Sequence, residues 1–360
     1  MYARCQLGDH GSNKMSNGNK VIVGLSGGVD SAVAAAILKQ KGYNVVGVTL
    51  SLLSYTKEDS VGCCSFNDTI DATKVCDLIG IEHLVVSRRK NFKAQVIDPF
   101  ISGHKQGVYH NPCITCNNTV KIPSLIAFAK HLGASHVVTG HYARIIDGKI
   151  AKGKDGNKDQ SYFLWELSSK EITDHLMFPL GDMTKVEVRA IAENMGLPVA
   201  AKKDSTNLCF LEGGTKAEFL AKHDIHPQKG NVLDGNGNVV GTHDGVHGFI
   251  PGQRLPIQSG DGKAKFVLKV IPDTNTILMG SKDELLTDKV AVHSIKWTDG
   301  AAPKSFTDIK AVCRYRQAPI PVEGIQGDTV FLGGNVYGAT PGQSIVFYNG
   351  DCVIGGGIIN

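Results

Sequence analysis

The sequence predicts an α/β fold, in which a parallel sheet is followed by a small central module and a C-terminal β-barrel-like module. Three observations lead to this prediction. Short apolar runs alternate with longer amphipathic stretches over about residues 20–140, which is typical of βαβ units. Residues 229–261 are rich in Gly, Asp and Asn, with short β-prone pieces between turns. From about residue 286 onward, β-prone runs are separated by glycines, as in a small barrel or sandwich.

The first elements alternate between strand and helix. Val21–Leu25 is a buried-strand run, and Ser31–Lys41 has helical apolar periodicity that stops at Gly42. The later expected strands are Val45–Leu50, His83–Val86 and His136–Thr139, and the expected helices are Asp68–Ile79 and Pro123–His131. Among the C-terminal runs we expect strands at Ala311–Tyr315, Thr329–Leu332 and Ser344–Tyr348.

These differences in composition and periodicity divide the chain into four segments. Residues 1–18 are polar and rich in Gly, Asn and Ser, so we expect a disordered extension, with Met15 as an alternative start. An α/β domain is expected at 19–213, the central module at 214–285 and the β-barrel-like module at 286–360.

Composition narrows the class of protein. The chain has 360 residues, of which 42% are hydrophobic and 20% charged, as in an ordinary folded soluble protein. It lacks an apolar run near the roughly 18 residues of a membrane helix, and residues 1–18 lack a signal-peptide core. We therefore expect a cytoplasmic location and no membrane partner. The net charge of +4 is compatible with a nucleic-acid partner without indicating one.

A glycine-rich loop joins the first strand to the first helix, with the sequence Ser26-Gly27-Gly28-Val29-Asp30-Ser31. Glycines let the backbone approach an anion closely, and the following helix offers free N–H groups and a positive dipole end. Ser26 and Ser31 add hydroxyl donors, and Asp30 suits a Mg²⁺ ion beside a phosphate. Neither a Walker A motif nor a G-x-G-x-x-G after a strand occurs, so the loop is a phosphate site of another kind.

Nine cysteines in a long chain without an export signal favour a reducing compartment, where cysteines do chemistry or bind metal. Cys113 and Cys116 form a C-x-x-C, and Cys209 lies far downstream. A structural zinc site usually needs a second such pair, which is missing. The three cysteines could hold an iron–sulfur cluster with one open iron position. Alternatively, Cys209 could carry a persulfide that Cys116 attacks, forming a transient disulfide. Reduced, buried thiols are expected at Cys5, Cys63, Cys64, Cys76, Cys313 and Cys352.

Along about residues 20–360, the sequence resembles the tRNA-specific 2-thiouridylases, a family of PP-loop ATP pyrophosphatases. The matching strings are SGGVDS (26–31), GCCS (62–65), NPCITCN (111–117), TGHYARI (139–145), DQSYFL (159–164), FPLGDMTKVEVR (178–189), KKDSTNLCF (202–210), PGQR (251–254) and ATPGQSIVFYNGDCVIGGGII (339–359). One departure is Tyr109-His110, which stands where the family usually has Thr-Pro.

The resemblance implies roles for particular residues. Residues 26–31 would bind the phosphates of ATP together with Mg²⁺ at Asp30, and Gly140 and His141 would lie near the nucleotide. Cys116 looks like the family's catalytic cysteine and Cys209 like its persulfide-bearing partner. Cys113 would complete the three ligands of a 4Fe-4S cluster, if the cysteines hold one.

The implied reaction is tRNA thiolation. ATP would adenylate the C2 oxygen of a wobble uridine, and sulfur would then replace that oxygen, with release of pyrophosphate and AMP. The sulfur donor would be a persulfide-carrying protein or an inorganic sulfide source. The central and C-terminal modules would grip tRNA, and Gln160 would lie near the target base.

Basic residues supply further candidates for tRNA contacts. Arg314 and Arg316 flank Tyr315, which suits phosphate contacts beside a stacking ring, although an alternating strand with its polar face outward explains the pattern equally simply. Lys121 is a candidate tRNA contact as well. Lys121, Lys202 and Lys203 are near the cysteines in sequence and could lower a thiol pKa, or they could be solvated surface lysines.

Two other classes of function are compatible with parts of the pattern. A PP-loop enzyme that adenylates a small carboxylate or a purine would need the loop but not the three cysteines. A sulfur-trafficking or iron–sulfur protein would need the cysteines but not an intact SGGVDS loop.

Overall fold

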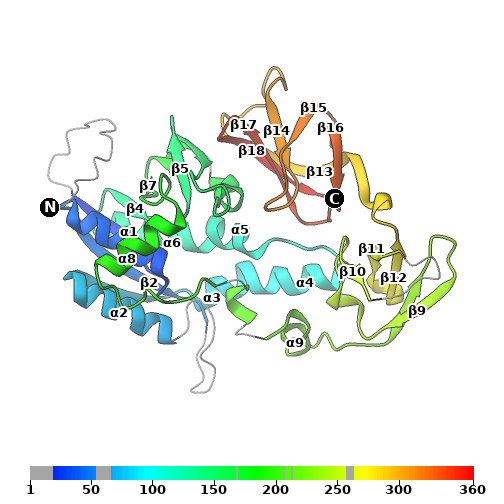
Figure 1. Cartoon of the computed structure of the whole chain (residues 1–360), viewed down its shortest axis with the longest axis horizontal. Helices are drawn as coiled ribbons and strands as arrows, with labels where there is room; N and C mark the ends of the chain where they lie inside the picture. Colours follow the sequence, from blue (N-terminus) through cyan, green and yellow to red (C-terminus); the bar gives the residue numbers. More distant parts are fainter. Residues whose placement is uncertain (1–18, 54–65, 168, 206, 212–213, 257–262) are drawn as a thin grey trace.

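The computed structural model describes residues 19–53, 66–167, 169–205, 207–211, 214–256 and 263–360. The expectation for residues 1–18, the GCCS string, and the interpretation of Cys5, Cys63 and Cys64 fall outside these residues. In Figure 1, the α/β part with the N-terminus lies at one end of the molecule, the central module at the other end, and the C-terminal barrel above and between them.

The α/β part contains a five-stranded sheet in the order β3-β2-β1-β4-β7, with neighbouring strands parallel. The strands are β1 Lys20–Gly24, β2 Asn44–Ser51, β3 Glu82–Ser87, β4 His136–Val138 and β7 Leu176–Met177. Strand order reverses between β1 and β4, because the chain builds outward from β1 first to one side and then to the other. Ligands of such sheets bind outside the carboxyl ends of the strands at this switch point.

Helices cover both faces of this sheet, which explains why its strands are continuously apolar. On one face, Val21 and Val23 share a core with α1 (Val29–Gln40), α2 (Phe66–Ile79) and α8 (Lys185–Asn194). On the other face, Ile22 and Val137 pack with α6 (Ile122–His131). The predicted parallel α/β fold is thus confirmed.

The cysteine segment lies in a broken helical stretch on that second face. A first run is made of α3 (Arg89–Phe92), the π-helical turn η1 (Lys93–Ile97) and α4 (Asp98–Gln106). A second run is made of α5 (Pro112–Cys116), the π-helical turn η2 (Asn117–Lys121) and α6. Asn111 caps α5 by accepting a hydrogen bond from the Cys113 N–H at 3.0 Å, and Pro112 occupies the first helical position. The C-x-x-C is therefore one helical turn that runs into a π turn, a local irregularity common at functional sites.

Smaller elements connect the sheet to the later modules. They include the hairpin β5 (Ala143–Ile146) and β6 (Lys149–Lys152), the 3₁₀ turns η3 (Ser161–Leu167) and η4 (Cys209–Leu211), and the helices α7 (Lys170–Thr173) and α9 (Lys216–Ala221). Most of these elements were not predicted, because they are short and have weak periodicity.

The central module is a five-stranded sheet in the order β10-β11-β12-β8-β9. Its strands are β8 Gly230–Leu233, β9 Val239–His243, β10 Arg254–Leu255, β11 Lys265–Ile271 and β12 Thr276–Gly280. Tyr109, from the segment between α4 and α5, packs in the core of this module with Val232, Val267 and Ile277. The residue that departs from the family pattern therefore joins the cysteine segment to the central module.

The C-terminal module is a closed antiparallel barrel, because β13 pairs with both β16 and β18. Its strands are β13 Leu286–Trp297, β14 Ile309–Val312, β15 Ile320–Gln326, β16 Thr329–Tyr337, β17 Ser344–Asn349 and β18 Cys352–Ile359. The β5–β6 hairpin of the α/β part extends this sheet through the pair Ala151 and Cys352. The predicted β-barrel-like module is confirmed.

One expected strand is shorter than predicted. We expected Ala311–Tyr315 to be a strand, whereas β14 ends at Val312 and Arg314–Arg316 lie in a turn. Arg316 has a φ of 66°, in the left-handed region that turns use and regular strands do not. The reason is tertiary, because Tyr315 leaves the barrel to pack against Phe163 of η3 with ring centroids 4.4 Å apart.

Candidate active site

The loop at residues 26–31 is held in place by its own hydrogen bonds. The Ser26 N–H donates to Ser31 Oγ at 3.1 Å, and Ser31 Oγ donates to the Gly28 carbonyl at 3.2 Å. Gly27 has a φ of 71°, and a Cβ there would lie 2.3 Å from the Asp68 carbonyl oxygen. Only glycine fits this position, so the close turn that the sequence suggested is present.

The loop opens directly into α1 with its polar groups available. Gly28 is the N-cap residue and contributes no side-chain cap, so no capping side chain occupies the first N–H groups of the helix. Ser26 is exposed beside them. Free N–H groups, a hydroxyl and the positive end of the helix dipole together form a surface that can bind phosphate oxygens.

The end of β4 lies against this loop. A Cβ on Gly140 would lie 2.7 Å from the backbone carbon of Asp30 and 2.7 Å from the Ser31 nitrogen, so the two backbones touch. The ring of His141, next in sequence, has Nδ1 2.7 Å from Thr139 Oγ1. Burial, aided by the charge of Lys121, lowers the pKa of His141 to about 3, so the ring is neutral at physiological pH. The part of these residues in nucleotide binding stays a prediction.

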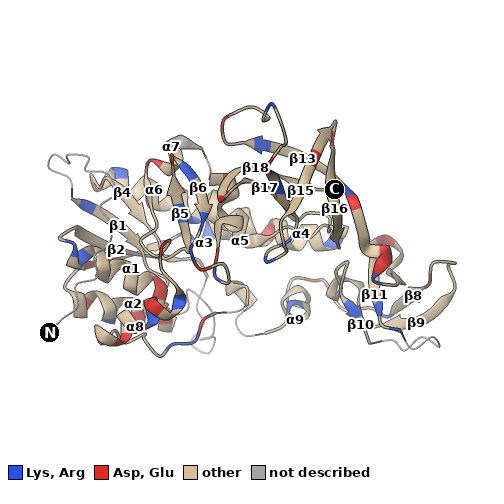
Figure 2. Cartoon of the chain, turned by 45° about the horizontal axis from the view of Figure 1, so that its top comes forward, with Lys and Arg blue, Asp and Glu red and all other residues tan. Residues whose placement is uncertain are grey.

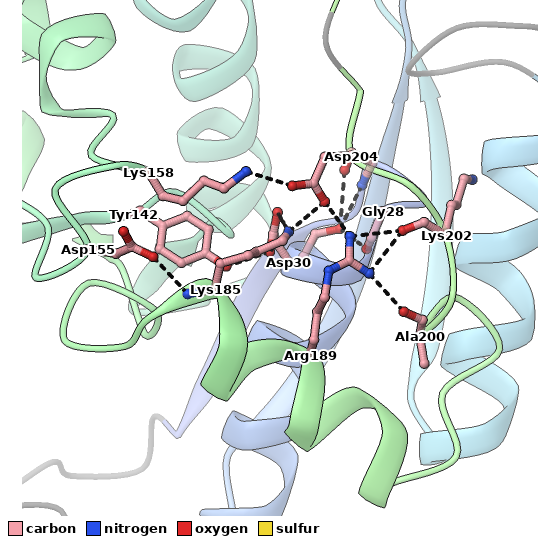
Figure 3. A network of polar contacts seen from close by, with 12 residues as sticks. Gly28, Asp30, Tyr142, Asp155, Lys158, Lys185, Arg189, Ala200, Lys202 and Asp204 are labelled. Carbon is pink, nitrogen blue, oxygen red and sulfur yellow. Dashed lines mark hydrogen bonds and ion pairs between the residues drawn. The ribbon is translucent and has the colours of Figure 1, made fainter. Parts of the chain in front are cut away.

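Asp30 belongs to a charged network that the sequence did not reveal (Figure 3). Lys185 Nζ donates to both Asp30 carboxylate oxygens at 2.7 and 2.8 Å and lies 2.9 Å from Asp204 Oδ1. Tyr142 Oη donates to Asp30 at 2.7 Å. Lys185 is only 8% exposed, so its ammonium depends on these partners for compensation.

Asp204 binds three cations. Besides Lys185, it accepts from Lys158 at 2.7 Å and from Arg189 at 2.6 Å. Partial burial raises the pKa of this carboxyl, but the hydrogen bonds and charges of Lys158 and Lys185 outweigh it and lower the pKa to about 2. A sequence signal for Lys185 did exist, since Thr184 and Glu187 form a capping box that marks the start of α8.

Lys202, which was expected either to act on a cysteine thiol or to be a solvated surface lysine, instead binds the phosphate loop and α2. Its Nζ donates to the Gly27 carbonyl at 2.9 Å, to Asp68 at 2.7 Å and to Asp71 at 2.6 Å. It therefore supports the loop from the side of α2. Lys203 is exposed.

Cys116 is buried at the end of α5. Burial raises the pKa of its thiol, while the charge and backbone N–H of Lys121 act in the opposite direction and do not overcome it. The same Lys121 charge reaches His141. The charge of Lys121 thus lowers the pKa of both the Cys116 thiol and the His141 ring, and on the thiol it acts in the predicted sense.

Cys209 lies in η4, where the neighbouring Phe210 packs on the rings of Phe92 and Phe100 at 6.2 and 5.0 Å. Cys116 and Cys209 both contact the same hydrophobic core on one face of the sheet. Cys113 is exposed on α5. The expected buried thiols are confirmed for Cys76 and Cys313, and burial raises the pKa of each to about 12. The expectation is wrong for Cys352, which is only half-buried at the start of β18, where the chain turns back from β17.

The two implied metal groups, an iron–sulfur cluster and Mg²⁺, need different sets of side chains. In the described part of the chain, no three His, Cys, Asp or Glu side chains are grouped to hold a metal ion. The cysteines, as placed, therefore do not fit an iron–sulfur cluster. Mg²⁺ has milder requirements, since one or two carboxylates with substrate phosphates and water are sufficient. Asp30 beside the loop meets that requirement if Lys185 releases it.

Gln160 lies next to the network. Its Oε1 accepts from the Tyr142 N–H at 3.0 Å, and its own N–H donates to the Tyr142 carbonyl at 2.9 Å. Since Tyr142 also binds Asp30, the structure brings together the loop, residues 140–142 and Gln160.

Arg314 and Arg316 are exposed where the barrel meets the α/β part. Arg316 stacks over the Tyr315 ring at 5.2 Å and donates to the Asn157 carbonyl at 3.4 Å. A Cβ on Gly252, in the PGQR string of the central module, would lie 3.6 Å from Arg314 Nη1. Both arginines therefore lie at the junction of the three parts, and their contact with tRNA stays a prediction.

A doubly wound sheet with a glycine-rich loop opening a helix at the switch point defines an α/β nucleotide-binding protein. A family model described as the tRNA methyl transferase HUP domain matches residues 19–213. By sequence similarity over nearly its whole length, the chain belongs to the tRNA-specific 2-thiouridylase family. Two further models match, a tRNA methyl transferase PRC-barrel domain at residues 217–281 and an aminomethyltransferase beta-barrel domain at residues 287–359.

The curated relatives carry one name, tRNA-specific 2-thiouridylase MnmA. The protein of Sorangium cellulosum is 40% identical over 358 residues, covering 96% of this chain and 93% of the relative. That of Aquifex aeolicus is 39% identical over 354 residues, covering 94% and 98%. That of Rippkaea orientalis is 37% identical over 353 residues, covering 95% and 99%.

Solved structures give weaker similarities. An NMN synthetase from Francisella tularensis aligns with a TM-score of 0.33 and 20% identity, covering 57% of this chain and 76% of that chain. A 4-thiouridine synthetase–RNA complex with bound ATP aligns with a TM-score of 0.34 and 16% identity, covering 57% and 49%. Within the described residues, no helix is both long and apolar enough to span a membrane.

Proposed function

We propose that this protein is a tRNA-uridine 2-sulfurtransferase. It uses ATP to adenylate the C2 oxygen of a wobble uridine in tRNA, and it then transfers a cysteine-borne sulfur to C2. The products are 2-thiouridine, AMP and pyrophosphate. Family membership supports the tRNA substrate, and the glycine-rich loop supports the use of ATP. The natural setting of this reaction is the cytoplasm.

One observation supports this proposal above the others. The phosphate loop and the end of β4 lie at the same edge of the sheet, and Lys121 links the end of β4 electrostatically to Cys116. The loop at residues 26–31 follows β1, residues 139–141 follow β4, and the charge of Lys121 reaches both His141 and Cys116. A uridine held at the end of β4 would face the ATP phosphates on one side and the cysteine turn on the other.

Adenylation makes the C2 oxygen a leaving group. The oxygen attacks the α-phosphorus of ATP, the bond to the bridging oxygen breaks, and pyrophosphate leaves. The N–H groups at the start of α1, with the Ser26 hydroxyl, stabilise the departing charge. Asp30, together with the phosphates, would hold Mg²⁺, which would supply further charge neutralisation. Lys185 would then turn from Asp30 toward the phosphates while keeping Asp204 as a partner.

Sulfur transfer uses the two cysteines in sequence. The terminal sulfur of a Cys209 persulfide attacks C2, and the C2–O bond breaks with AMP taking the electron pair. The thiolate of Cys116 then attacks the Cys209 sulfur, and the S–S bond electrons pass to the sulfur on C2. The uridine is released as its thione, and a Cys116–Cys209 disulfide remains for a thiol reductant. The initial persulfide forms when the Cys209 thiolate attacks the outer sulfur of a donor protein's persulfide, whose S–S bond breaks and leaves the donor as a thiolate. Inorganic sulfide can form it only by attacking Cys209 of the Cys116–Cys209 disulfide, which releases the Cys116 thiolate.

The buried state of Cys116 fits a gated nucleophile. Its raised pKa keeps the thiol protonated in the structure described here. Lys121 is already near, so an increase in local hydration on tRNA binding would shift the balance toward the thiolate that attacks. Since the cysteines do not converge as cluster ligands, the persulfide route is the one that the arrangement supports.

A pair of variants tests the two half-reactions separately. Asp30→Asn keeps the hydrogen bond from Tyr142 but removes the charge, so tRNA-dependent AMP release should fall at least about a hundredfold. Cys116→Ser should leave AMP release measurable and abolish 2-thiouridine, quantified by nucleoside mass spectrometry. Normal thiouridine formation by the serine variant, under anaerobic or aerobic conditions, would rule out the cysteine relay. AMP release that does not depend on tRNA would instead favour a small-molecule acceptor.

A further inference from the structure

A large open pocket lies beside the candidate active site and has no assigned ligand. Its volume is about 650 Å³, within the range of about 300–1,000 Å³ that is usual for ligand sites. Its walls come from the segment after β2, from α3 and η1, from η4, and from α9 with the residues that follow it. Figure 1 shows α3 at the end of α4 nearest the α/β part, and α9 below α4 on the side away from the barrel.

The pocket combines an apolar floor with a basic rim. The floor includes the rings of Phe92, Phe210 and Phe219, and Phe210 and Phe219 lie 4.9 Å apart. The rim carries four exposed cationic side chains, which are Arg89, Lys90, Lys93 and Lys222. The basic residues of α3 can be followed in Figure 2. Among the described residues that line the pocket, Glu218 is the one carboxylate.

Part of this charge is already compensated and part is not. Lys93 pairs with Asp98 at 2.6 Å, and Glu218 accepts a hydrogen bond from the Thr215 N–H at 2.7 Å as the helix cap of α9. Lys90 makes no ion pair with any described residue. Among the described residues, Lys90 and Lys222 therefore add positive charge above the apolar floor.

The position of the pocket relates it to the reaction. Leu52 and Leu53 of its wall follow the carboxyl end of β2, and β2 pairs with β1, which leads into the phosphate loop. Phe210 and Leu211 of its wall follow Cys209 in the same turn. The pocket thus opens at the sheet edge where ATP and sulfur are proposed to act, one strand away from the loop.

We propose that this pocket binds a nucleotide adjacent to the target uridine in the anticodon loop. The inference rests on the proposed function and adds a second subsite to it. Single-stranded RNA is held by bases stacking on aromatic rings while cations contact its phosphates. Phe92 and Phe210 are buried, so the half-buried ring of Phe219 is the one of these three that a base can reach, and the rim lysines supply the cations. When a uridine enters the active site, the nucleotides on either side of it are held along the same edge of the sheet. A neighbouring base that has lost its stacking partner therefore needs a surface to stack on.

Charge reversal at the rim tests the phosphate contacts. The variant is Lys90→Glu with Lys222→Glu, and the matched control is Lys41→Glu with Lys130→Glu. The control lysines are exposed where α1 and α6 end, at the opposite edge of the sheet. We expect the rim variant to weaken binding of an anticodon stem–loop RNA at least about tenfold. The slope of log affinity against log salt should become shallower by about 1.4, for two single-strand phosphate contacts.

Phe219→Leu tests the stacking, because leucine preserves burial but removes the aromatic face. With wild type, replacing a base next to the target uridine by an abasic residue should weaken RNA binding about tenfold, the usual scale of base–aromatic stacking. The leucine variant should bind the intact RNA about as weakly as wild type binds the abasic RNA. It should also be nearly insensitive to the abasic change. MgATP affinity should stay unchanged in all these variants.

The outcomes separate this subsite from the reaction itself. If wild type binds the stem–loop and makes thiouridine but the rim variant binds RNA as the control does, the nucleotide subsite is wrong and the proposed function stands. If RNA affinity is retained and only transfer from a persulfide-carrying protein fails, the pocket receives that donor, which also overturns the subsite. If wild type binds no RNA, the proposed function and the subsite fail together.

Discussion

At the scale of single residues, the site depends on one buried cation between two carboxylates. Lys185 is held by Asp30 and Asp204, and Asp204 is held in turn by Lys158 and Arg189. Removing one member of such a group leaves a charge without compensation, which costs more than the pair contributes when intact. The network therefore stabilises the fold and also keeps Asp30 at the mouth of the loop.

Replacing Asp204 by Asn should give a pH-dependent loss of stability. The folded-state pKa of about 2 lies below the ordinary value of about 3.9, so the stabilisation is present above pH 4 and is lost as pH falls toward 2. The carboxylate is 30% exposed, so we discount for solvent and expect about 1–2 kcal/mol at pH 7. Urea unfolding at pH 7, 5, 4 and 3 measures the difference from wild type.

The control is Asp299→Asn, which removes a surface pair with Lys149 at 2.7 Å whose carboxylate is 69% exposed. That loss should stay below about 1 kcal/mol at every pH. A difference for Asp204→Asn that remained constant from pH 7 to pH 3 would contradict the assigned cause.

At the scale of elements, the site is made by backbone segments that touch. The turn after β4 lies on the start of α1 at Gly140, and the turn after β1 lies on α2 at Gly27. In both places glycine is required by close approach of another backbone, and at Gly27 also by its φ of 71°. Small shifts between these elements would misplace the N–H groups that face the phosphates.

Gly140→Ala should therefore weaken ATP binding with little effect on the sheet core. The added Cβ would lie 2.7 Å from the backbone of Asp30, so β4 and α1 must separate, at a cost of about 1–3 kcal/mol. We expect MgATP affinity, measured by equilibrium dialysis, to fall about tenfold or more. Gly156→Ala is the control, because nothing lies within 4 Å of a Cβ at that position. Equal affinities in the two variants would show that this contact does not position the loop.

At the scale of the whole molecule, the C-terminal barrel is joined to the cysteine segment by one turn. The Tyr109 N–H donates to the Pro341 carbonyl at 2.7 Å, and Gln343 donates to the Tyr109 carbonyl. A Cβ on Gly342 would lie 2.6 Å from the Tyr109 nitrogen. Since Tyr109 also fills the core of the central module, all three parts meet immediately before Asn111-Pro112-Cys113.

Gly342→Ala should uncouple the barrel from the cysteine turn. We expect thiouridine formation at saturating tRNA to fall about fivefold or more, while MgATP affinity changes less than about twofold, because the loop is on another element. Gly350→Ala is the matched control, since Gly350 also has positive φ, 56° against 86°, but open space around its Cβ. Backbone strain alone would affect both variants similarly. A parallel fall in MgATP affinity would instead indicate general loss of folding.

Patterns of neighbouring residues in the sequence were sufficient to predict the parallel sheet, the order of its first elements and the phosphate loop. They were also sufficient to single out Cys113, Cys116 and Cys209. These features are readable because strands buried on both faces are continuously apolar, and because a phosphate turn needs glycine at particular positions. The network of Asp30 with Tyr142, Lys185 and Asp204 could not be found in this way, since Tyr142 and Lys185 contact Asp30 across 112 and 155 residues of chain and Asp204 joins it through Lys185. The π turn after Cys116 leaves no periodic signature either.

The tertiary structure alone decided which groups share the site. It directed Lys202 to Asp68 and Asp71, brought the charge of Lys121 to act on both Cys116 and His141, and packed Tyr315 onto Phe163. The physical reason is that local structure follows from neighbours along the chain, whereas burial and charge depend on segments that meet only after the chain has packed. The sequence by itself therefore determines which reactive groups the protein has, and the fold determines which of those groups can act together.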